Sequence, residues 1–443
     1  MRPPVVVKFG GGALSDLPRV LKHVRRARSS PSPLVVVVSA RRGVTDLLLK
    51  AIDSGGEVRP EMVESGLREL HPRLSTSEPE LFVRVRTLLT RLSVARSPLR
   101  PVRDELLSQG ERLAAHWLAG ELAEAGIPSI AVESDHLGLT TDESYGASLI
   151  QISRSTPQVR PGLERLLAEG LVPVVTGYFG RSDAGHVTTL GRGGSDYTAV
   201  ALGRILSAQR VELVKRNVAV LTADPRWVPA ATRIPRLSYD EAEELAQFGA
   251  SVLHPAAIAP AREGNIDLTV RSLIDPHIST RIGPSSARPT FRCVTALGPL
   301  AMVGVRLPGA RLRGGILAAV AQALSDAAIN AQALVTTEAV IGILVDPSDS
   351  DRTEAVLAPL AQRLGGRVRP SPPVQLLSVL GPRVLERVAR IPRWILRESF
   401  GLLATSRAIS VAIPEGDAPR AMRALHREFV DVGAPSRTRR ARS

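Results

Sequence analysis

Two glycine-rich turns at strand and helix boundaries constrain the fold of this chain more than any other feature. The first turn, Lys8-Phe9-Gly10-Gly11, ends an apolar run over Val5–Phe9 that is typical of a buried strand. The second, Leu190-Gly191-Arg192-Gly193-Gly194-Ser195-Asp196, opens an apolar helix predicted over Ser195–Leu206. Backbone N–H groups at such turns can surround anionic oxygens, so the pair predicts a phosphate-binding site in an α/β fold.

Lysine usage draws attention to Lys8. The chain has only four lysines among its 57 basic residues, and the others are arginines. A compact ammonium at a strand end can reach a phosphoryl group during transfer, and Asp196 beside the second turn can orient it. From position alone, a solvent-exposed lysine at the end of a strand is an equally good interpretation.

Apolar runs and helical periodicities alternate along residues 1–285, which predicts a three-layer αβα domain with a central sheet. Residues 61–125 are expected to be mostly helical. Strands are expected at Val5–Phe9, Leu34–Ser39, Ser129–Glu133, Val172–Thr176, Val211–Val214 and Leu268–Arg271.

Two smaller units are predicted after a glycine- and proline-containing linker at residues 283–289. Residues 294–368 and 372–433 are each expected to form a ferredoxin-like βαββαβ module, as an internal repeat. The second copy is irregular, because Val384–Phe400 is rich in arginine and is interrupted by Pro392. Residues 434–443 form a basic tail.

Composition excludes several classes of protein. The net charge of +14 suggests nucleic acid, but aromatic residues make up only 3% and the arginines are spread along the whole chain. No apolar run approaches the ~20 residues of a membrane span, and the N-terminus lacks a secretory signal, so a cytoplasmic protein is expected. The single Cys293 cannot form an internal disulfide, and the eight histidines show no metal-ligand spacing.

A series of sequence blocks follows the first turn in a fixed order: Val35–Ala40 with Gly43–Asp46, Gly110–Leu113, Pro173–Gly177, Thr188–Ala199, Leu221–Arg226, and Phe248–Ala250 with Val252–Pro255. Together with Lys8–Gly11, they make the chain resemble the aspartokinases of the amino-acid kinase family over nearly its full length. The two C-terminal modules resemble the paired ACT domains of that family, which bind amino-acid effectors and dimerise.

The resemblance implies ATP-dependent phosphorylation of the side-chain carboxylate of L-aspartate, the first step of the aspartate-family amino-acid pathway. It implies that Lys8 and Asp196 are catalytic and that aspartate is bound by Thr45, Glu111, Arg192 and Ser195. The implied nucleotide and phosphate ligands are Gly10, Gly11, Gly193, Gly194, Lys215, Arg216 and Arg226. Mg²⁺ would arrive with ATP, so no protein metal site is expected.

Three places depart from the family pattern, mainly on the nucleotide side. Gly12-Ala13 stands where the family has Thr-Ser, Lys215–Ala219 replaces a segment with a Thr-Asp pair, and Ser251 replaces a lysine. One hypothesis is that Lys215 or Arg216 supplies the charge lost at Ser251. The alternative is a kinase-like regulatory subunit that binds aspartate or an effector and transfers phosphate poorly.

Further alternatives concern the acceptor, the cofactor and the C-terminal modules. A kinase for another acceptor is disfavoured by Arg192 and Glu111, and a dinucleotide-binding site is disfavoured by the glycine spacing at Gly10–Gly12. In the first module, a glycine at the helix start after Pro308–Arg313 and Asn330 after the helix suggest an effector such as lysine or threonine. A purely dimerising pair of modules remains open, and either interpretation predicts a homodimer or larger homo-oligomer.

Overall fold

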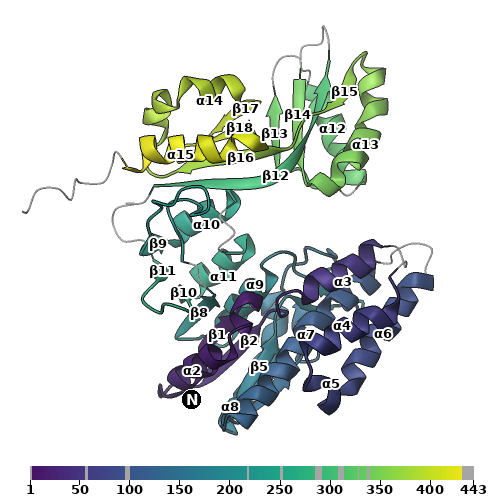
Figure 1. The fold of residues 1–443 in the computed structure, drawn as a ribbon, viewed down its shortest axis with the longest axis vertical. Helices are drawn as coiled ribbons and strands as arrows, with labels where there is room; N and C mark the ends of the chain where they lie inside the picture. The colour runs from purple at the N-terminus through teal and green to yellow at the C-terminus, as the bar shows by residue number, and fades with distance from the viewer. Residues whose placement is uncertain are drawn as a thin grey trace, which may run out of the picture. The chain divides into compact units, whose positions relative to one another are not determined.

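The computed structural model describes residues 2–54, 58–94, 100–216, 219–249, 253–284, 292–307, 314–327, 329–336 and 340–431. The chain forms two compact units (Figure 1). Unit 1 consists of Met1–Val220, Pro235–Ala246 and Ser251–Ser286. Unit 2 consists of Leu221–Ile234, Gln247–Ala250 and Ala287–Ser443. The single boundary predicted near residue 285 therefore differs from the observed division, in which two earlier segments belong to unit 2.

The core of unit 1 is an eight-stranded sheet in the order β3-β5-β2-β1-β8-β10-β11-β9. All neighbouring strands are parallel except β10 and β11. β1 and β2 are fully buried and consist mainly of valines, as expected of strands covered on both faces. The strands are β1 (Val5–Phe9), β2 (Leu34–Val38), β3 (Ser129–Val132), β5 (Val172–Thr176), β8 (Arg210–Lys215), β9 (Arg236–Ser238), β10 (Asp267–Ser272) and β11 (Ser279–Gly283).

The helices of unit 1 complete the predicted αβα architecture, with α7 packed against β2, β3 and β5 and α9 packed against β1 and β8. A small sheet adds β4 (Thr140–Thr141), β6 (Phe179–Ser182) and β7 (Val187–Thr189). Helices α3 to α7 form one group, as Figure 1 shows. The helices are α1 (Gly11–Leu14), α2 (Leu17–Arg28), α3 (Val44–Asp53), α4 (Pro60–Leu70), α5 (Leu74–Ser77), α6 (Pro79–Val94), α7 (Arg100–Glu124), α8 (Ile152–Ala168), α9 (Gly194–Ile205), α10 (Tyr239–Gln247), η1 (Pro255–Ala257) and α11 (Ile258–Glu263).

Unit 2 is built on a sheet in the order β13-β14-β12-β16-β18-β17, with β15 also paired to β12. Its strands are β12 (Cys293–Arg306), β13 (Ala333–Thr336), β14 (Val340–Val345), β15 (Arg367–Pro370), β16 (Val374–Leu380), β17 (Gly401–Ala404) and β18 (Ala408–Pro414). The helices are α12 (Gly314–Asp326), η2 (Pro347–Asp349), α13 (Ser350–Arg363), η3 (Leu385–Arg390), α14 (Arg393–Glu398), η4 (Glu415–Asp417) and α15 (Ala418–Phe429).

The long strand β12 serves both C-terminal modules. Its first half, from Cys293 to Leu300, pairs with β16, whereas Ala301–Arg306 pairs with β14 and Val303–Arg306 also pairs with β15. The first module is therefore inserted into the second, instead of preceding it as the sequence repeat predicts. The expected interruption at Pro392 is present, because η3 ends before it and α14 begins after it.

The segment Leu221–Ile234 belongs to unit 2 because of what it buries. Ala223 and Val228 lie in the same apolar core as Met422 and Phe429 of α15. The hydroxyl of Thr222 also lies 3.0 Å from Nε2 of the buried His426. These contacts explain why a segment in the middle of the chain is part of the C-terminal unit.

Several sequence predictions fall outside the described residues: Ser251, Asn217 and Val218, the turn Pro308–Arg313, most of the linker and the tail 434–443. Among the residues that the structure describes, no helix combines the length and apolar character needed to cross a membrane.

Candidate active site

Three charged side chains meet where β1, β8 and α9 come together. The Nζ atom of Lys8 lies 2.6 Å from Oδ1 of Asp196, and Nζ of Lys215 lies 3.1 Å from Oδ2. The side chains of Lys8 and Asp196 are almost completely buried, and that of Lys215 is 20% exposed. The structure therefore places two ammonium groups on one carboxylate.

The two lysines keep Asp196 ionised despite its burial. Burial alone raises the pKa of a carboxyl group, but the charges of Lys215 and Lys8 outweigh it and lower the pKa of Asp196 to about 2. Asp196 lies in the first turn of α9, where the helix N-terminus also favours a negative charge. The group thus combines one ionised carboxylate with two lysine side chains.

The first glycine turn leads directly from β1 into α1. Gly10 is the residue before this short helix, and its N–H donates to the Val214 carbonyl. Gly11 and Gly12 form the first helical positions, and within the described residues their N–H groups have no backbone acceptor. Gly10 is therefore corrected from a predicted phosphate donor to a link between β1 and β8.

The second glycine turn leads into α9. Gly191 and Gly193 adopt the left-handed conformation, with φ of 75° and 82°. The N–H of Gly194 donates to the Gly191 carbonyl, so it also differs from the predicted phosphate donor. In the part of the chain that is described, the N–H groups of Gly193 and Ser195 have no backbone acceptor and are available to an anion.

Glu111 is a buried carboxyl group on α7. Its Oε1 accepts a hydrogen bond of 2.9 Å from the Ala40 N–H, just after β2. Burial raises the pKa of Glu111 to about 8, although this hydrogen bond and the charge of Lys8 oppose the shift. Ala40 also lies against Gly11, because a Cβ placed on Gly11 would be 2.2 Å from the Ala40 carbonyl oxygen, so Glu111 is linked to the first glycine turn.

The other predicted aspartate ligands lie at helix starts. Thr45 is half-buried in the first turn of α3, which follows the left-handed Gly43. Ser195 is buried in the first turn of α9, and Arg192 in the adjoining turn is exposed. No ion pair engages Arg192 among the described residues.

Two predicted nucleotide ligands are not part of this charged group. Arg216 is exposed and follows β8, with its Cβ next to Gly12. Arg226 lies in unit 2, where its mostly exposed side chain pairs with Asp224 at 2.6 Å. Lys215, by contrast, lies in unit 1 and contacts Asp196.

Sequence reasoning missed three residues that support the second glycine turn. Asp104 is buried on α7 and accepts hydrogen bonds from the Gly146 and Thr189 N–H groups, at 2.9 and 2.7 Å. Tyr178 is held at φ 76°, and burial raises the pKa of its phenol to about 12. His254 packs against Gly193. In the sequence, the available signals were an acidic residue, Asp104, near the start of an apolar helical pattern, and a histidine directly before Pro255.

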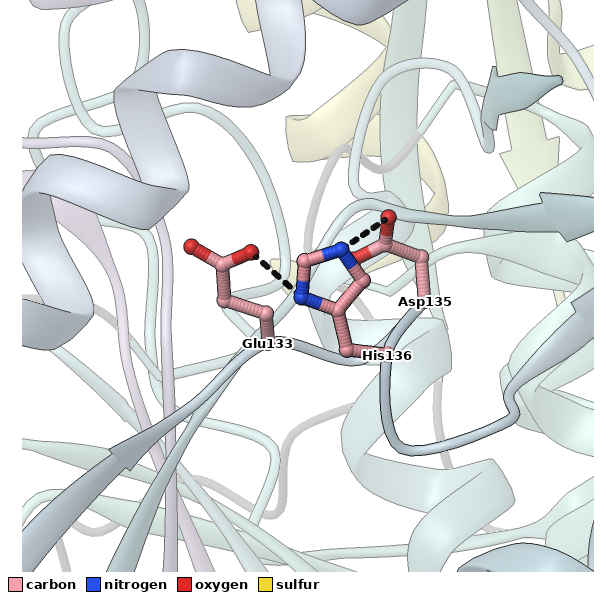
Figure 2. A group of neighbouring side chains, drawn as sticks. All are labelled: Glu133, Asp135 and His136. Carbon is pink, nitrogen blue, oxygen red and sulfur yellow. Dashed lines mark ion pairs between the residues drawn. The ribbon is translucent and has the colours of Figure 1, made fainter. Parts of the chain in front are cut away.

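A second charged group lies at the end of β3, where Figure 2 shows the His136 ring between Glu133 and Asp135. The nearest nitrogen–oxygen distances are 3.1 Å to Glu133 and 3.8 Å to Asp135. Such a group could hold a cation, but the buried Arg112 pairs with both carboxylates and Arg181 pairs with Asp135. It is therefore an ion-pair network that fixes α7, and with it the neighbouring Glu111.

Known proteins are similar to this chain in sequence and in fold. The sequence model of the amino acid kinase family matches residues 3–272. The chain is 29% identical to the chloroplastic aspartokinase 1 of Arabidopsis thaliana over an alignment 466 positions long, which covers 97% of this chain and 80% of that protein.

Two crystal structures of Escherichia coli aspartokinase III are similar in fold. The complex with aspartate and ADP, an R-state, gives a TM-score of 0.82 at 26% identity. The complex with lysine and aspartate, a T-state, gives a TM-score of 0.71 at 26% identity. Each comparison covers 96% of this chain and 99% of the other.

Proposed function

The chain belongs to the amino acid kinase family, and on that premise we propose that it is an aspartokinase. It transfers the γ-phosphoryl group of ATP to the side-chain carboxylate of L-aspartate and forms 4-phospho-L-aspartate and ADP. Similarity over nearly the whole chain to an aspartokinase that binds aspartate and ADP supports this function.

The observation that carries the proposal is the group Lys8, Asp196 and Lys215. Both reactants are anions, so a carboxylate can approach a triphosphate only where their charges are neutralised. Two buried or half-buried ammonium groups around one carboxylate give a net positive site for that purpose. This arrangement favours a working kinase over a subunit that only binds aspartate.

The chemistry requires no general base. An oxygen of the aspartate carboxylate bonds to the γ-phosphorus while the bond to the β,γ-bridging oxygen breaks and ADP leaves. The attacking carboxylate carries no proton that must be removed. Lys8 and Lys215 neutralise the oxygens of the transferred group, and Asp196 holds both ammonium groups in place. Backbone N–H groups donate to the phosphates from Gly11, Gly12, Gly193 and Ser195.

L-Aspartate is bound by the residues at the helix starts. Arg192 grips one carboxylate through two parallel N–H···O bonds. Thr45 and the hydroxyl of Ser195 address the other carboxylate, and ionised Glu111 faces the ammonium group. Acceptors that lack this ammonium group, or carry it at another distance, lose the contact with Glu111.

Mg²⁺ enters as part of the substrate MgATP. Both oxygens of Asp196 already lie beside lysine ammonium groups, so this carboxylate does not suit a cation. Phosphate oxygens and water are the preferred ligands of Mg²⁺ in such sites. We therefore assign it no protein ligand.

The C-terminal modules supply regulation and assembly in this proposal. Lysine is the first candidate effector, because a similar aspartokinase binds it in a T-state complex, and threonine is the second. The paired modules form a homodimer or larger homo-oligomer, and the enzyme acts in the cytoplasm. Titration with lysine and threonine distinguishes effector binding from modules that only dimerise.

Trapping the product tests the function directly. The full chain is incubated with MgATP, L-aspartate and hydroxylamine, which converts an acyl phosphate to a coloured hydroxamate. We expect hydroxamate with L-aspartate and none with succinate, which lacks the ammonium group. Absence of product with L-aspartate, combined with calorimetric binding of aspartate but not of MgATP, would instead establish the non-catalytic alternative.

A further inference from the structure

His254 packs against the second glycine turn from the side of η1. A Cβ atom placed on Gly193 would lie 3.4 Å from Cβ of His254 and 3.6 Å from Cδ2. The imidazole also stacks on the ring of Tyr197 in α9, with ring centroids 5.4 Å apart and planes within 5°. His254 therefore contacts both the turn and the helix that the turn opens.

Hydrogen bonds define which ring nitrogen carries the proton. The Ala256 N–H donates to Nδ1 at 3.1 Å, so Nδ1 is unprotonated and caps η1. The other nitrogen, Nε2, then carries the hydrogen and bonds to the backbone of Leu190, the first residue of the turn. Burial lowers the pKa of His254, and the charge of Asp196 opposes this only in part, so the ring is neutral at pH 7.

The turn needs such an anchor because its own geometry is permissive. Gly191 and Gly193 have no side chains to restrict their left-handed backbone, and Arg192 between them is exposed. Leu190 is held on one side by its N–H, which donates to the Tyr178 carbonyl. The bond from His254 holds the same residue from the other side.

We propose that His254 is a positioning residue for phosphoryl transfer, whose imidazole holds the Leu190–Gly194 turn so that its N–H groups and Arg192 meet the substrates. This inference rests on the proposed kinase function. Displacing such donors by about 1 Å can cost an enzyme about 100-fold in rate, even when the change lies away from the reacting atoms. His254 thus acts through the turn and touches neither substrate.

Two substitutions of His254 each keep one of the two hydrogen bonds of the imidazole and remove the other. In His254→Asn the amide oxygen replaces Nδ1 and keeps the η1 cap, but the side chain is too short to reach Leu190. In His254→Gln the amide nitrogen replaces Nε2 and keeps the bond to Leu190, but the cap is lost. His186→Gln, at an exposed histidine, is the matched control.

The readout is kcat per folded molecule at saturating MgATP and L-aspartate, with thermal unfolding of each variant measured in parallel. We expect His254→Asn to lose about 10- to 100-fold in kcat, while His254→Gln and His186→Gln stay within a few-fold of the parent chain. Equal losses in Asn and Gln, a loss in Gln alone, or no loss in either would overturn the inference. Lack of activity in the parent chain would contradict the kinase function instead.

Discussion

The Nζ atom of Lys8 and the Oδ1 atom of Asp196 lie 2.6 Å apart, and neither side chain is more than 6% exposed. One residue belongs to β1 and the other to α9, so the pair closes the contact between the two glycine turns. Because each charge is taken out of water, each depends on the other for compensation. Function and stability are therefore linked at this pair.

Replacing Lys8 by alanine removes the ammonium group closest to Asp196. We expect hydroxamate formation to fall at least on the order of 100-fold, the size typical of one lost transition-state contact. Lys22→Ala is the control, because Lys22 is an exposed lysine on α2. If the Lys8 variant kept full activity, this lysine would have no catalytic role.

Replacing Asp196 by asparagine leaves two ammonium groups without a counter-charge. We expect activity to be lost and the free energy of unfolding at pH 7 to fall by about 3 kcal/mol. The pKa of Asp196 is about 2 when folded and 3.8 when unperturbed. Its contribution is thus present above pH 3.8 and disappears as the pH falls through about 2. Urea titrations across this range should show the gap between the parent and the variant narrowing in acid.

Lys215 and Arg216 are adjacent but should behave differently. Lys215 contacts Asp196, whereas Arg216 is exposed. Lys215→Ala is expected to lower kcat/KM for MgATP on the order of 100-fold, and Arg216→Ala to change it only slightly. Steady-state kinetics at saturating L-aspartate measure both. The reverse order would show that Arg216 supplies the second phosphate-facing charge.

Glu111 gives aspartate binding a pH dependence. With a pKa of about 8 in the free protein, Glu111 is mostly neutral at pH 7 and must ionise to face an ammonium group. The Kd for L-aspartate should therefore fall as the pH rises toward 8 and level off above it. Calorimetry on Glu111→Gln should show weaker binding of L-aspartate and a Kd that no longer changes with pH. If the Kd of this variant kept the same pH dependence, that dependence would belong to another group.

The same carboxyl group affects stability in the opposite direction. Its pKa is raised from 4.5 to about 8 on folding, so the folded state binds more protons between these values. Stability should accordingly decline as the pH rises through that window. At pH 9 we expect Glu111→Gln to unfold at a higher temperature than the parent chain. An equal or lower unfolding temperature would contradict the claim that burying the ionised Glu111 carboxylate destabilises the fold.

Gly11 and Gly12 form a matched pair for the first turn. A Cβ on Gly11 would lie 2.2 Å from the Ala40 carbonyl oxygen, whereas a Cβ on Gly12 meets nothing nearer than 3.8 Å. Gly11→Ala should displace the turn and lower kcat about 100-fold. Gly12→Ala should keep activity and gain up to about 1 kcal/mol from helix propensity. Comparable losses in both variants would mean that any side chain here blocks the substrates.

Sequence alone predicted six strands of unit 1, β1, β2, β3, β5, β8 and β10, because runs such as Val5–Phe9 are apolar enough to fix a buried strand locally. It did not predict the strands β9 and β11 or the short strands β4, β6 and β7. It could not predict that β12 is shared by two modules, since that depends on pairing between residues far apart in the chain. The βαββαβ pattern predicted a second helix in the first module, but the sequence did not give its bounds, because α13 contains Pro359, which usually disfavours a helix interior.

The choice between Lys215 and Arg216 shows the same limit. In the sheet Lys8 is in register with Leu213 of β8, and side chains on a strand alternate between faces. Lys215 therefore shares the face of Lys8, and Arg216 does not. Once β1 and β8 are known to be neighbours the choice follows, but nothing in the local sequence identifies them as neighbours.

The membership of Leu221–Ile234 in unit 2 affects how this protein can be dissected. No single cut separates the two units, because the chain leaves unit 1 after residue 220, returns at residue 235, leaves again after residue 246, and returns at residue 251 before it finally leaves after residue 286. A version shortened to residues 1–286 would keep Ala223 and Val228 but lack α15, against whose core they pack. Such a fragment is expected to expose apolar surface and aggregate, so excising the C-terminal modules is a poor way to obtain an unregulated enzyme.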